Sequence, residues 1–322
     1  MKKILILFGG SSHEYEISCR SAKTILDNID KKKYQVSTVG ITKNNEWYIF
    51  NDNSKLLETD WLEGKITKIE NIPKYLKQFD KVFPIIHGNP LENGNLQGLF
   101  DIFNIPYVGT NLEGSIISYD KELTKIICNN HSILQVPYIT LYKPSKLKNI
   151  DLEFPVIIKP SKCGSSIGIN IANNIKELNK YVTEAFKYDD KVIIEKFIKS
   201  RELECAVLEN KTLKVSPVGE IKSTNTFYDY EAKYIKDSKL LIPANIPKNL
   251  EKDIQELSLK IFNILSLKDL ARIDFLYDYQ NNKLYFNEVN TMPGFTSISM
   301  YPLLFNYSGI KIKDLITKLI EN

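Results

Sequence analysis

The chain has 322 residues, enough for two or three domains, and 43% hydrophobic with 25% charged residues is the composition of an ordinary globular protein. Its net charge of +4 is too small to indicate nucleic-acid binding, and no apolar run approaches the roughly 18 residues of a membrane span. The four cysteines lack metal-ligand spacing, and the five apolar residues after Lys3 are fewer than the roughly 7 of a signal peptide. We therefore expect a cytoplasmic protein that binds neither nucleic acid nor a membrane.

The first third of the chain alternates short apolar runs with stretches at helical spacing. The runs predict strands at residues 4–8, 35–41, 81–86 and 106–108, and the spacing predicts helices that begin near Ser21 and Leu96. Such alternation is typical of an α/β sheet.

From about Pro137 onward the strand signal dominates. We expect strands at 156–159, 167–171, 192–197, 204–208 and 213–218, a strand pair at 271–277 and 283–289, and helices at 175–185, 250–265 and 310–320. Residues 220–240 are polar and aromatic without periodicity. Because loops of about 20 residues are usually functional or disordered, we expect a lid there.

A lysine followed by small residues forms the first chemical motif. Lys159 ends an apolar strand and precedes a loop that contains Gly164, Ser165, Ser166 and Gly168. Backbone N–H groups of such a loop can surround phosphate oxygens while the lysine supplies a positive charge. An ordinary glycine hairpin is the alternative.

The strand at 192–197 ends in a carboxylate and a lysine, Glu195 and Lys196, and Ile198 and Glu202 follow. Backbone groups and Glu195 at this strand end could bind adenine, and Glu202 could bind ribose hydroxyls. The alternative is a surface Glu–Lys pair that closes the strand.

The third motif places polar residues on two consecutive strands, with Arg272 and Asp274 on one and Glu288 and Asn290 on the other. Side chains two residues apart in a strand share a face, so a hairpin would present three oxygen ligands to a hard cation beside Arg272. Magnesium prefers a few carboxylates together with substrate phosphates. A solvated polar face is the alternative.

Two loops could complete a site. In the segment 291–300, the Gly294 N–H and the hydroxyl of Ser299 could hold an oxyanion and a carboxylate. Residues 9–16 follow the first strand, where α/β sheets bind ligands, although Glu14 and Glu16 could instead favour the start of a helix.

Taken in order, these motifs closely resemble the D-alanine:D-alanine ligases of the ATP-grasp superfamily over nearly the whole chain. The motifs are Lys-Pro-Ser-x-x-Gly-Ser-Ser, Ile-Glu-Lys, Thr-Phe-Tyr-Asp-Tyr-Glu-Ala-Lys-Tyr, Arg-Ile-Asp, Glu-x-Asn-Thr-x-Pro-Gly and Thr-Ser-x-Ser. The resemblance implies a combined α/β and α+β fold. It implies a Rossmann-like α/β substrate domain at 1–118, a central lid domain at 119–200, and a catalytic antiparallel-sheet domain at 201–322 with a lid loop at 220–240.

The resemblance also implies the ligands of each site. ATP would contact Lys121, Lys159, Ser165, Ser166, Glu195, Lys196, Ile198, Glu202, Phe227 and Asn287. Two Mg²⁺ ions, with Mn²⁺ as the alternative metal, would bind Asp274, Glu288 and Asn290. In a mobile loop at 227–234, Lys233 would meet phosphate and Tyr234 would face substrate.

The implied reaction joins two D-alanines through D-alanyl phosphate, for peptidoglycan precursor synthesis. The first D-alanine would lie near Glu14, His87 and Glu92, and the second near Ser299 and Met300. Arg272 and Gly294 would stabilise the oxyanion, and Ser165 and Tyr234 would form a hydrogen-bonded set with Glu14. D-serine or D-lactate as the second substrate, or a different ATP-grasp carboxylate–amine ligase, are the alternatives. Family likeness also implies a homodimer.

Two segments depart from the family pattern. The family commonly has His-Gly-x-x-Gly-Glu-Asp-Gly, whereas this chain has Leu91 in place of the glycine before the glutamate and Asn93 in place of the aspartate. We expect an altered first-substrate pocket. Cys163 stands beside Gly164, so the phosphate loop could react with thiol reagents if the thiol is exposed.

Overall fold

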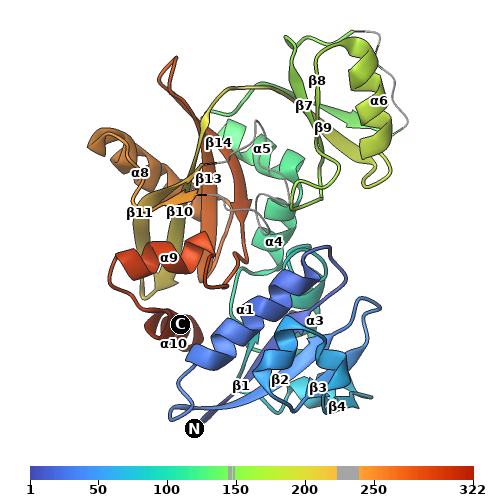
Figure 1. Cartoon of the computed structure of the whole chain (residues 1–322), viewed down its shortest axis with the longest axis vertical. Coiled ribbons are helices and arrows are strands. Elements are labelled where there is room, and N and C mark those ends of the chain that lie inside the picture. Colours follow the sequence, from blue (N-terminus) through green and yellow to red (C-terminus); the bar gives the residue numbers. More distant parts are fainter. Residues whose placement is uncertain (144–146, 148, 223–238) are drawn as a thin grey trace.

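The computed structural model describes residues 1–143, 147, 149–222 and 239–322. Three sheets organise these residues, with the first at the end of the molecule that carries the amino terminus and the smallest at the opposite end (Figure 1). None of the helices within the described ranges is long and apolar enough to cross a bilayer.

The first sheet has the order β4-β3-β2-β1-β5, with β1 parallel to β2 and β5, and β3 antiparallel to β2 and β4. Its strands are β1 (Lys2–Gly9), β2 (Tyr34–Ile41), β3 (Trp47–Phe50), β4 (Ile66–Lys68) and β5 (Lys81–Pro84). The helical segments of this region are α1 (Tyr15–Asn28), η1 (Ser54–Glu58), η2 (Trp61–Glu63), α2 (Ile72–Leu76) and α3 (Asn95–Phe103). The strand β1 is buried from its third residue on both faces, which is typical of a central parallel strand.

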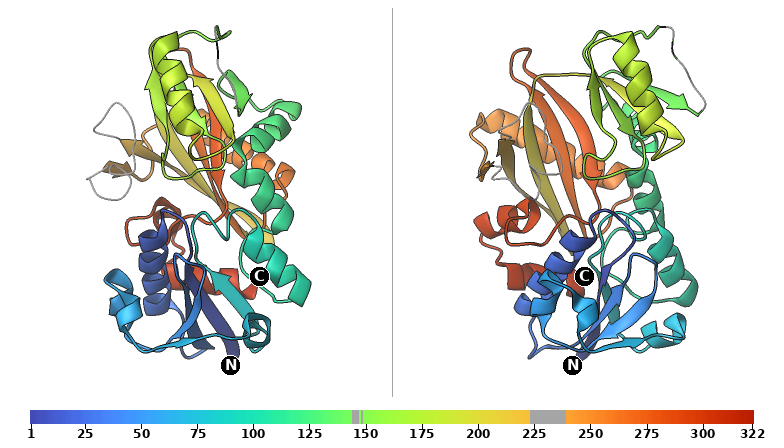
Figure 2. Two further views of the ribbon diagram at one scale, coloured as in Figure 1. Left: turned by 90° about the vertical axis from the view of Figure 1, so that its right-hand side faces the viewer. Right: turned by 45° about the vertical axis from the view of Figure 1, so that its right-hand side comes forward.

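The smallest sheet has the order β6-β9-β7-β8, and all of its pairs are antiparallel. Its elements are β6 (Tyr138–Tyr142), β7 (Val156–Pro160), β8 (Asn170–Ala172), α6 (Ile175–Ala185) and β9 (Lys191–Lys196). The helices α4 (Leu112–Tyr119) and α5 (Lys121–Asn130) connect the first sheet to this one, as Figure 2 shows. Leu178, Val182 and Ala185 of α6 pack on the sheet and close a separate small core.

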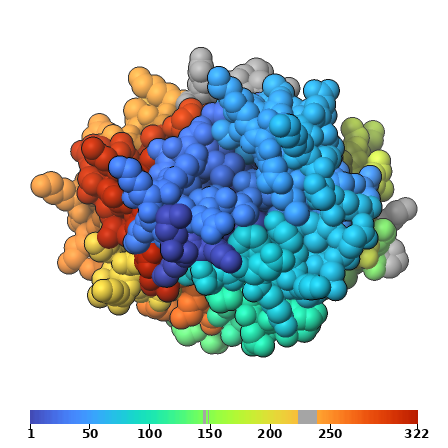
Figure 3. All heavy atoms as spheres, turned by 90° about the horizontal axis from the view of Figure 1, so that it is seen from below, coloured from blue at the N-terminus to red at the C-terminus, as the bar shows by residue number. Residues whose placement is uncertain are grey.

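The third sheet has the order β12-β11-β10-β13-β14 and is antiparallel throughout. Its elements are β10 (Arg201–Asn210), β11 (Thr212–Lys222), β12 (Lys239–Leu241), α8 (Lys248–Ile264), β13 (Leu270–Asp278), β14 (Lys283–Asn290), α9 (Met300–Tyr307) and α10 (Ile312–Glu321). The apolar residues of α8 pack with one face of the sheet, while those of α9 and α10 join the core of the first sheet. Seen from below, the first and last segments of the chain form one continuous surface (Figure 3).

The fold class expected from the sequence is confirmed, but several element boundaries were wrong. The helix expected from Ser21 begins at Tyr15. Its first two turns bury the polar residues Ser18 and Ser21 beside apolar ones, so the apolar spacing did not reveal them. The strand expected at 106–108 is reduced to a single bridge between Val82 and Tyr107. Both ends of the loop expected at 220–240 belong to strands, since β11 ends at Lys222 and β12 begins at Lys239.

Candidate active site

Two adjoining cavities lie where the three sheets meet. The larger has a volume of about 410 Å³ and runs from Glu14, His87 and Glu92 to Ser299, Met300 and Leu303. The smaller, of about 100 Å³, lies between β7 and the strands β10, β13 and β14. Both are lined by Lys121, Cys163, Gly164, Ser165, Glu204 and Glu288. A ligand in one cavity would therefore touch the wall of the other.

The phosphate loop predicted after Lys159 forms part of this shared wall. Lys159 lies at the end of β7 and lines the smaller cavity. Ser165 and Ser166 both have left-handed backbones, with φ of 51° and 60°, a conformation that is costly for residues other than glycine and is concentrated at functional sites. The buried Ser165 Oγ has no hydrogen-bond partner among the residues that the structure describes. Its hydroxyl therefore remains available to a ligand.

Lys121 holds the loop from the other side. It is the first residue of α5, and its Nζ donates to the carbonyl oxygen of Cys163 at 2.8 Å and lies 3.8 Å from Glu288 Oε2. The Cys163 thiol is partly buried, and burial raises its pKa, which disfavours the reactive thiolate.

Glu195, predicted to bind adenine, does not line either cavity but is buried behind the smaller one. Its two carboxylate oxygens accept Lys125 Nζ and Lys159 Nζ, each at 2.6 Å. Burial alone would raise the pKa of Glu195, but the two lysines outweigh it and lower that pKa to about 2. Burial likewise opposes the charge of Lys159, yet the carboxylate of Glu195 raises the pKa of Lys159. Glu195 and Lys159 are therefore both charged at neutral pH.

The other residues predicted to bind nucleotide are divided between the cavity wall and the surface. Ser166, Glu202 and Asn287 line the smaller cavity, and Asn287 Oδ1 accepts Lys159 Nζ at 3.4 Å. Lys196 lies toward the surface and pairs with the exposed Glu153 at 2.5 Å. Ile198 lies two residues after the end of β9 and does not line either cavity.

The predicted hairpin of β13 and β14 brings the third motif together. Asp274 lies opposite Glu288, and Arg272 lies opposite Asn290. Arg272 donates Nε and one terminal N–H to the two oxygens of Asp274, both at 2.8 Å, and its Nε lies 3.0 Å from Glu204 Oε2 on β10. The Asn290 amide donates to Asp274 at 2.9 Å. The arginine expected beside the cation ligands is thus paired with one of them.

The donor chemistry of Asp274, Glu288 and Asn290 fits a hard divalent cation. Two carboxylates and an amide on opposed strands border the cavities, and oxygen ligands of this kind suit magnesium when phosphate oxygens complete the coordination shell. Within the described ranges no cluster of three or more His, Cys, Asp and Glu residues is suited to hold a metal without such help. The three residues could therefore hold a metal together with a phosphate ligand.

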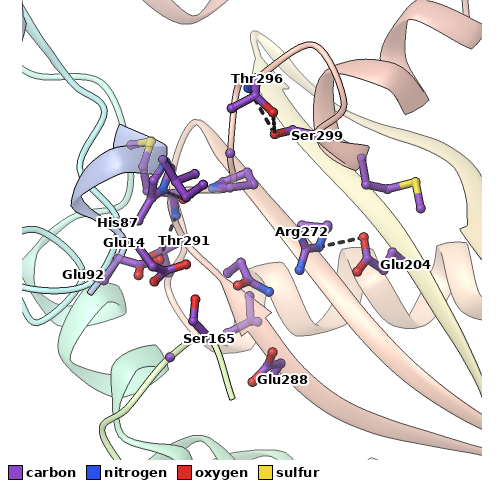
Figure 4. Close-up of a pocket in the computed structure, with 18 of the residues that line it drawn as sticks. Glu14, His87, Glu92, Ser165, Glu204, Arg272, Glu288, Thr291, Thr296 and Ser299 are labelled. Carbon is purple, nitrogen blue, oxygen red and sulfur yellow. Dashed lines mark hydrogen bonds and ion pairs between the residues drawn. The ribbon is translucent and has the colours of Figure 1, made fainter. Parts of the chain in front are cut away.

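Loops from the first sheet build the far end of the larger cavity, where Glu14, His87 and Glu92 gather (Figure 4). Glu14 Oε2 lies 3.1 Å from the point where a Cβ on Gly164 would stand, so a side chain there would crowd this carboxylate. Glu92 accepts the Gly88 N–H at 2.6 Å and the Met292 N–H at 3.3 Å. Burial, followed by the charge of Glu14, raises the pKa of Glu92 to about 7.

His87 is fixed by two hydrogen bonds. Its Nδ1 donates to the Met292 carbonyl at 2.8 Å, and its Nε2 lies 3.3 Å from Ser21 Oγ, which also accepts the Phe295 N–H at 3.1 Å. Burial lowers the pKa of His87, so the ring is neutral and Nε2 accepts from the serine. The histidine and Ser21 thus connect the first sheet to the loop after β14.

That loop carries the other predicted substrate residues. Ser299 Oγ accepts the Thr296 N–H at 3.0 Å and lies 2.8 Å from Thr296 Oγ1. A Cβ on Gly294 would stand 2.7 Å from Ser299 Oγ, so a larger residue there would displace this hydroxyl. Met300, Leu303, Ile221 and Leu240 add an apolar wall to the larger cavity.

Of the two family departures, Leu91 lies in the core of the first sheet, buried, and lines neither cavity. Asn93 donates to Asn89 Oδ1 at 2.7 Å. Three predicted residues, Phe227, Lys233 and Tyr234, lie outside the described residues.

Sequence reasoning missed three residues that support the site, namely Lys125, Glu204 and Ser21. Lys125 follows Lys121 by four residues on α5, which places both on one helix face, and this spacing was the available signal. Glu204 follows Glu202 by two residues on β10, which gives them a common face. For Ser21 no local signal exists, because its partners lie far away in the sequence.

Comparisons with known proteins agree with this geometry. The chain matches the family described as "D-ala D-ala ligase N-terminus" over residues 3–110 and that described as "D-ala D-ala ligase C-terminus" over residues 127–321. A D-alanine–D-alanine ligase of Clostridium acetobutylicum is 43% identical, with 99% of this chain and 97% of the relative covered. One of Caldicellulosiruptor bescii is 42% identical, with 99% and 94% covered.

Solved structures show the same likeness. The VanG D-Ala:D-Ser ligase of Enterococcus faecalis superposes with a TM-score of 0.88 at 33% identity and covers 99% of this chain and 98% of its own. The Bacillus anthracis D-alanine–D-alanine ligase complexed with ATP gives a TM-score of 0.78 at 27% identity, with 100% and 97% covered. With the matches spanning both ends of the chain and both cavities, the protein belongs to the D-alanine–D-alanine ligase family.

Proposed function

We propose that this chain joins two D-alanine molecules with ATP, through a D-alanyl phosphate, to supply a precursor of peptidoglycan. The observation that carries the proposal is the shared wall of the two cavities. Phosphate held by the loop at Ser165 in one cavity adjoins an amino acid held near Glu14 in the other. Such proximity is what transfer of a phosphoryl group to a carboxylate requires.

The first step needs an ammonium group bound and a carboxylate aimed at phosphate. We assign the ammonium of the first D-alanine to Glu14, whose carboxylate reaches Gly164 of the phosphate loop. The carboxylate of the substrate then attacks the γ-phosphorus, the bond to ADP breaks, and the Lys159 ammonium offsets negative charge on the phosphates. Phosphate then replaces an oxygen that is a poor leaving group.

In the second step the amine of the second D-alanine attacks the acyl phosphate and phosphate leaves. Arg272 and the Gly294 N–H are the proposed donors to the tetrahedral oxyanion, and Ser299 is the proposed partner of the second carboxylate. Arg272 contacts the carboxylates of both Asp274 and Glu204. To act as an oxyanion donor, it must weaken its bonds to Asp274 while it stays paired with Glu204. Lys233 and Tyr234, which lie outside the described residues, are the proposed partners of phosphate and substrate.

Asp274, Glu288 and Asn290 are the proposed magnesium ligands. When bound there, magnesium or manganese would neutralise charge on the phosphates. The chain's own contribution is to hold these oxygens on two paired strands, where their spacing is fixed by the backbone ladder.

The apolar wall of Met300, Leu303, Ile221 and Leu240 favours D-alanine as the second substrate, because a methyl group fits it and a hydroxyl gains no partner from it. D-serine is the second candidate, since the VanG D-Ala:D-Ser ligase shares the fold. One methyl or hydroxyl in such a pocket discriminates by only about 1–3 kcal/mol.

The test is mass spectrometry of products formed from ATP, magnesium and single amino acids. We expect the D-alanyl-D-alanine dipeptide from D-alanine, little mixed product when D-serine or D-lactate is added, and no phosphate release with L-alanine. Equal phosphate release with L-alanine and D-alanine would refute the substrate assignment. A homodimer and a cytoplasmic location remain predictions, which sedimentation and cell fractionation can test.

A further inference from the structure

A buried trio of charged side chains lies behind the smaller cavity. Glu195 of β9 accepts Lys125 Nζ of α5 at Oε1 and Lys159 Nζ of β7 at Oε2, each at 2.6 Å. The side chains of Lys125 and Glu195 are 3% exposed, and that of Lys159 is 12% exposed. Of the three, Lys159 alone lines that cavity.

We propose that Lys125 is a positioning residue for the nucleotide: by sharing the carboxylate of Glu195 it keeps Lys159 from being neutralised, and a positive charge remains directed at the phosphates. The identity of the ligand as a nucleotide rests on the proposed function. The ion-pair geometry does not.

The charges of the trio do not cancel. Two ammonium groups share one carboxylate, so one positive charge is in surplus, in a region where a low effective dielectric makes interactions strong. Burying a charge without an opposite charge nearby costs free energy. An anion that reaches this positive charge removes that cost and is therefore bound more tightly. Lys159 is the member that an anion in the cavity can reach. Glu288 and Glu202, the other carboxylates that act on Lys159, line the same cavity.

Lys125 is held in place from two sides. It lies one turn after Lys121 on α5, and its ammonium lies 4.8 Å from the ring centre of Tyr138. Tyr138 pairs with Glu195 across β6 and β9, so the ring and the carboxylate approach the same ammonium. Because Lys125 does not line either cavity, any effect on a ligand must pass through Glu195.

Without Lys125, Glu195 would face Lys159 alone. The pair would be neutral, and the Lys159 ammonium would be held by a full carboxylate charge instead of a shared one. Phosphate would then have to compete with Glu195 for this lysine. A purely structural ion pair would instead affect stability and leave the balance between nucleotide and amino-acid binding unchanged.

Lys125→Met tests the inference in the full-length protein, with Lys125→Arg as the matched control that keeps the charge. Titration calorimetry with ADP and magnesium is the binding measurement. We expect Lys125→Met to weaken ADP binding roughly 10- to 100-fold, the range for a hydrogen bond to a charged group, and Lys125→Arg to bind close to the unaltered protein. The KM for ATP should rise in parallel while the KM for D-alanine stays unchanged.

A rescue variant separates charge sharing from structure. Adding Glu195→Gln to Lys125→Met removes the competing carboxylate, so ADP binding should recover most of its loss, whereas a second structural defect would weaken binding further. Equal losses for Met and Arg at position 125, or no recovery in the double variant, would overturn the proposal. Thermal unfolding checks that each variant folds, and Lys125→Gln replaces Lys125→Met if the latter does not.

The two proposals can fail separately. If the unaltered protein forms no dipeptide but the ADP measurements follow the expected pattern, only the proposed substrate is wrong. If dipeptide forms and Lys125→Met binds ADP normally, only the role of Lys125 is wrong.

Discussion

The two cavities share a wall but are built differently. The smaller is framed by strands, and the charged groups at and behind it are paired between strands and α5 at short distances, as in the contacts of Glu195 with Lys125 and Lys159. The larger is assembled from loops that follow β1, β5 and β14, and the loop residues meet through backbone N–H and carbonyl groups, as in the contacts of Glu92 and His87. The positions of the charged groups around the smaller cavity are therefore set by the pairing of the strands. The shape of the larger cavity is set by contacts between loops.

The largest expected effect is at Arg272, which lines the larger cavity and contacts Asp274 and Glu204, two residues that line the smaller one. Arg272→Lys keeps a positive charge but cannot reproduce the two parallel bonds to Asp274 together with the contact to Glu204. We expect kcat to fall about 10²- to 10³-fold, the usual cost of losing an oxyanion donor. Steady-state phosphate release at saturating substrates measures it. An unchanged kcat would place the oxyanion donor elsewhere.

A substitution at Leu91 tests whether this departure from the family pattern affects the larger cavity or only the stability of the fold. Since its side chain is buried in the core and lines neither cavity, Leu91→Gly should lower the free energy of unfolding by about 3 kcal/mol through lost packing and added chain entropy. The KM for D-alanine should stay the same. Urea denaturation and initial rates measure the two quantities, and a changed KM with unchanged stability would reverse this assignment.

Glu92 should give the loop-built cavity a pH dependence that the strand-built one lacks. Its folded pKa of about 7 is raised above the ordinary 4.5, so the folded protein binds the proton more tightly, and the stabilisation is complete below pH 4.5 and lost as pH rises through 7. We expect the contribution of Glu92 to the free energy of unfolding to fall by about 2 kcal/mol from pH 5 to pH 7. The lowered pKa of the neighbouring His87 acts in the opposite direction over this range.

The matched control for this prediction is Glu92→Gln, which keeps the size of the side chain and removes the titration. Denaturant unfolding at a series of pH values should show the stability of the unaltered protein declining relative to that of the variant, because the contribution of His87 is present in both. Glu195 does not interfere, because its pKa of about 2 moves its own transition below this range. Parallel curves for both proteins would mean that another group titrates.

The smallest expected effect is at Lys196, predicted from its motif to contact nucleotide. Its ammonium pairs with the exposed Glu153, and such surface pairs contribute about 0–1 kcal/mol. Lys196→Ala should therefore leave the KM for ATP nearly unchanged, whereas Lys159→Ala should raise it strongly. If both substitutions raised the KM equally, the side chain of Lys196 would have to leave Glu153 when nucleotide binds.

The same contrast explains what could be predicted from the sequence. Alternation along β13 and β14 was enough to place Arg272 with Asp274 and Glu288 with Asn290, because strand geometry fixes which side chains share a face. The fold class followed from the apolar runs and the family motifs. The predicted domain boundaries at 118/119 and 200/201 remain predictions.

The rest depended on tertiary contacts, for which the spacing of Lys121 and Lys125 on one helix face was only an indirect signal. Lys125 looks like an ordinary solvent-exposed helix lysine, and its partner Glu195 is 70 positions away along the chain, on a different element. The motif assigned Glu195 to adenine because a strand end is a common place for such a contact, whereas the two lysines around it are visible only in three dimensions. Ser21 of α1 and Met292 of the loop after β14 likewise meet His87 only in the assembled structure.

The apolar wall of Met300, Leu303, Ile221 and Leu240 belongs to the larger cavity and not to the smaller one. Mutations there can alter which amino acid is accepted without disturbing the residues that hold phosphate. On the proposed function, proteins of this fold can therefore differ in product while they share the residues of the smaller cavity. A wall that belongs to one cavity alone is consistent with the close superposition of this chain on a D-Ala:D-Ser ligase.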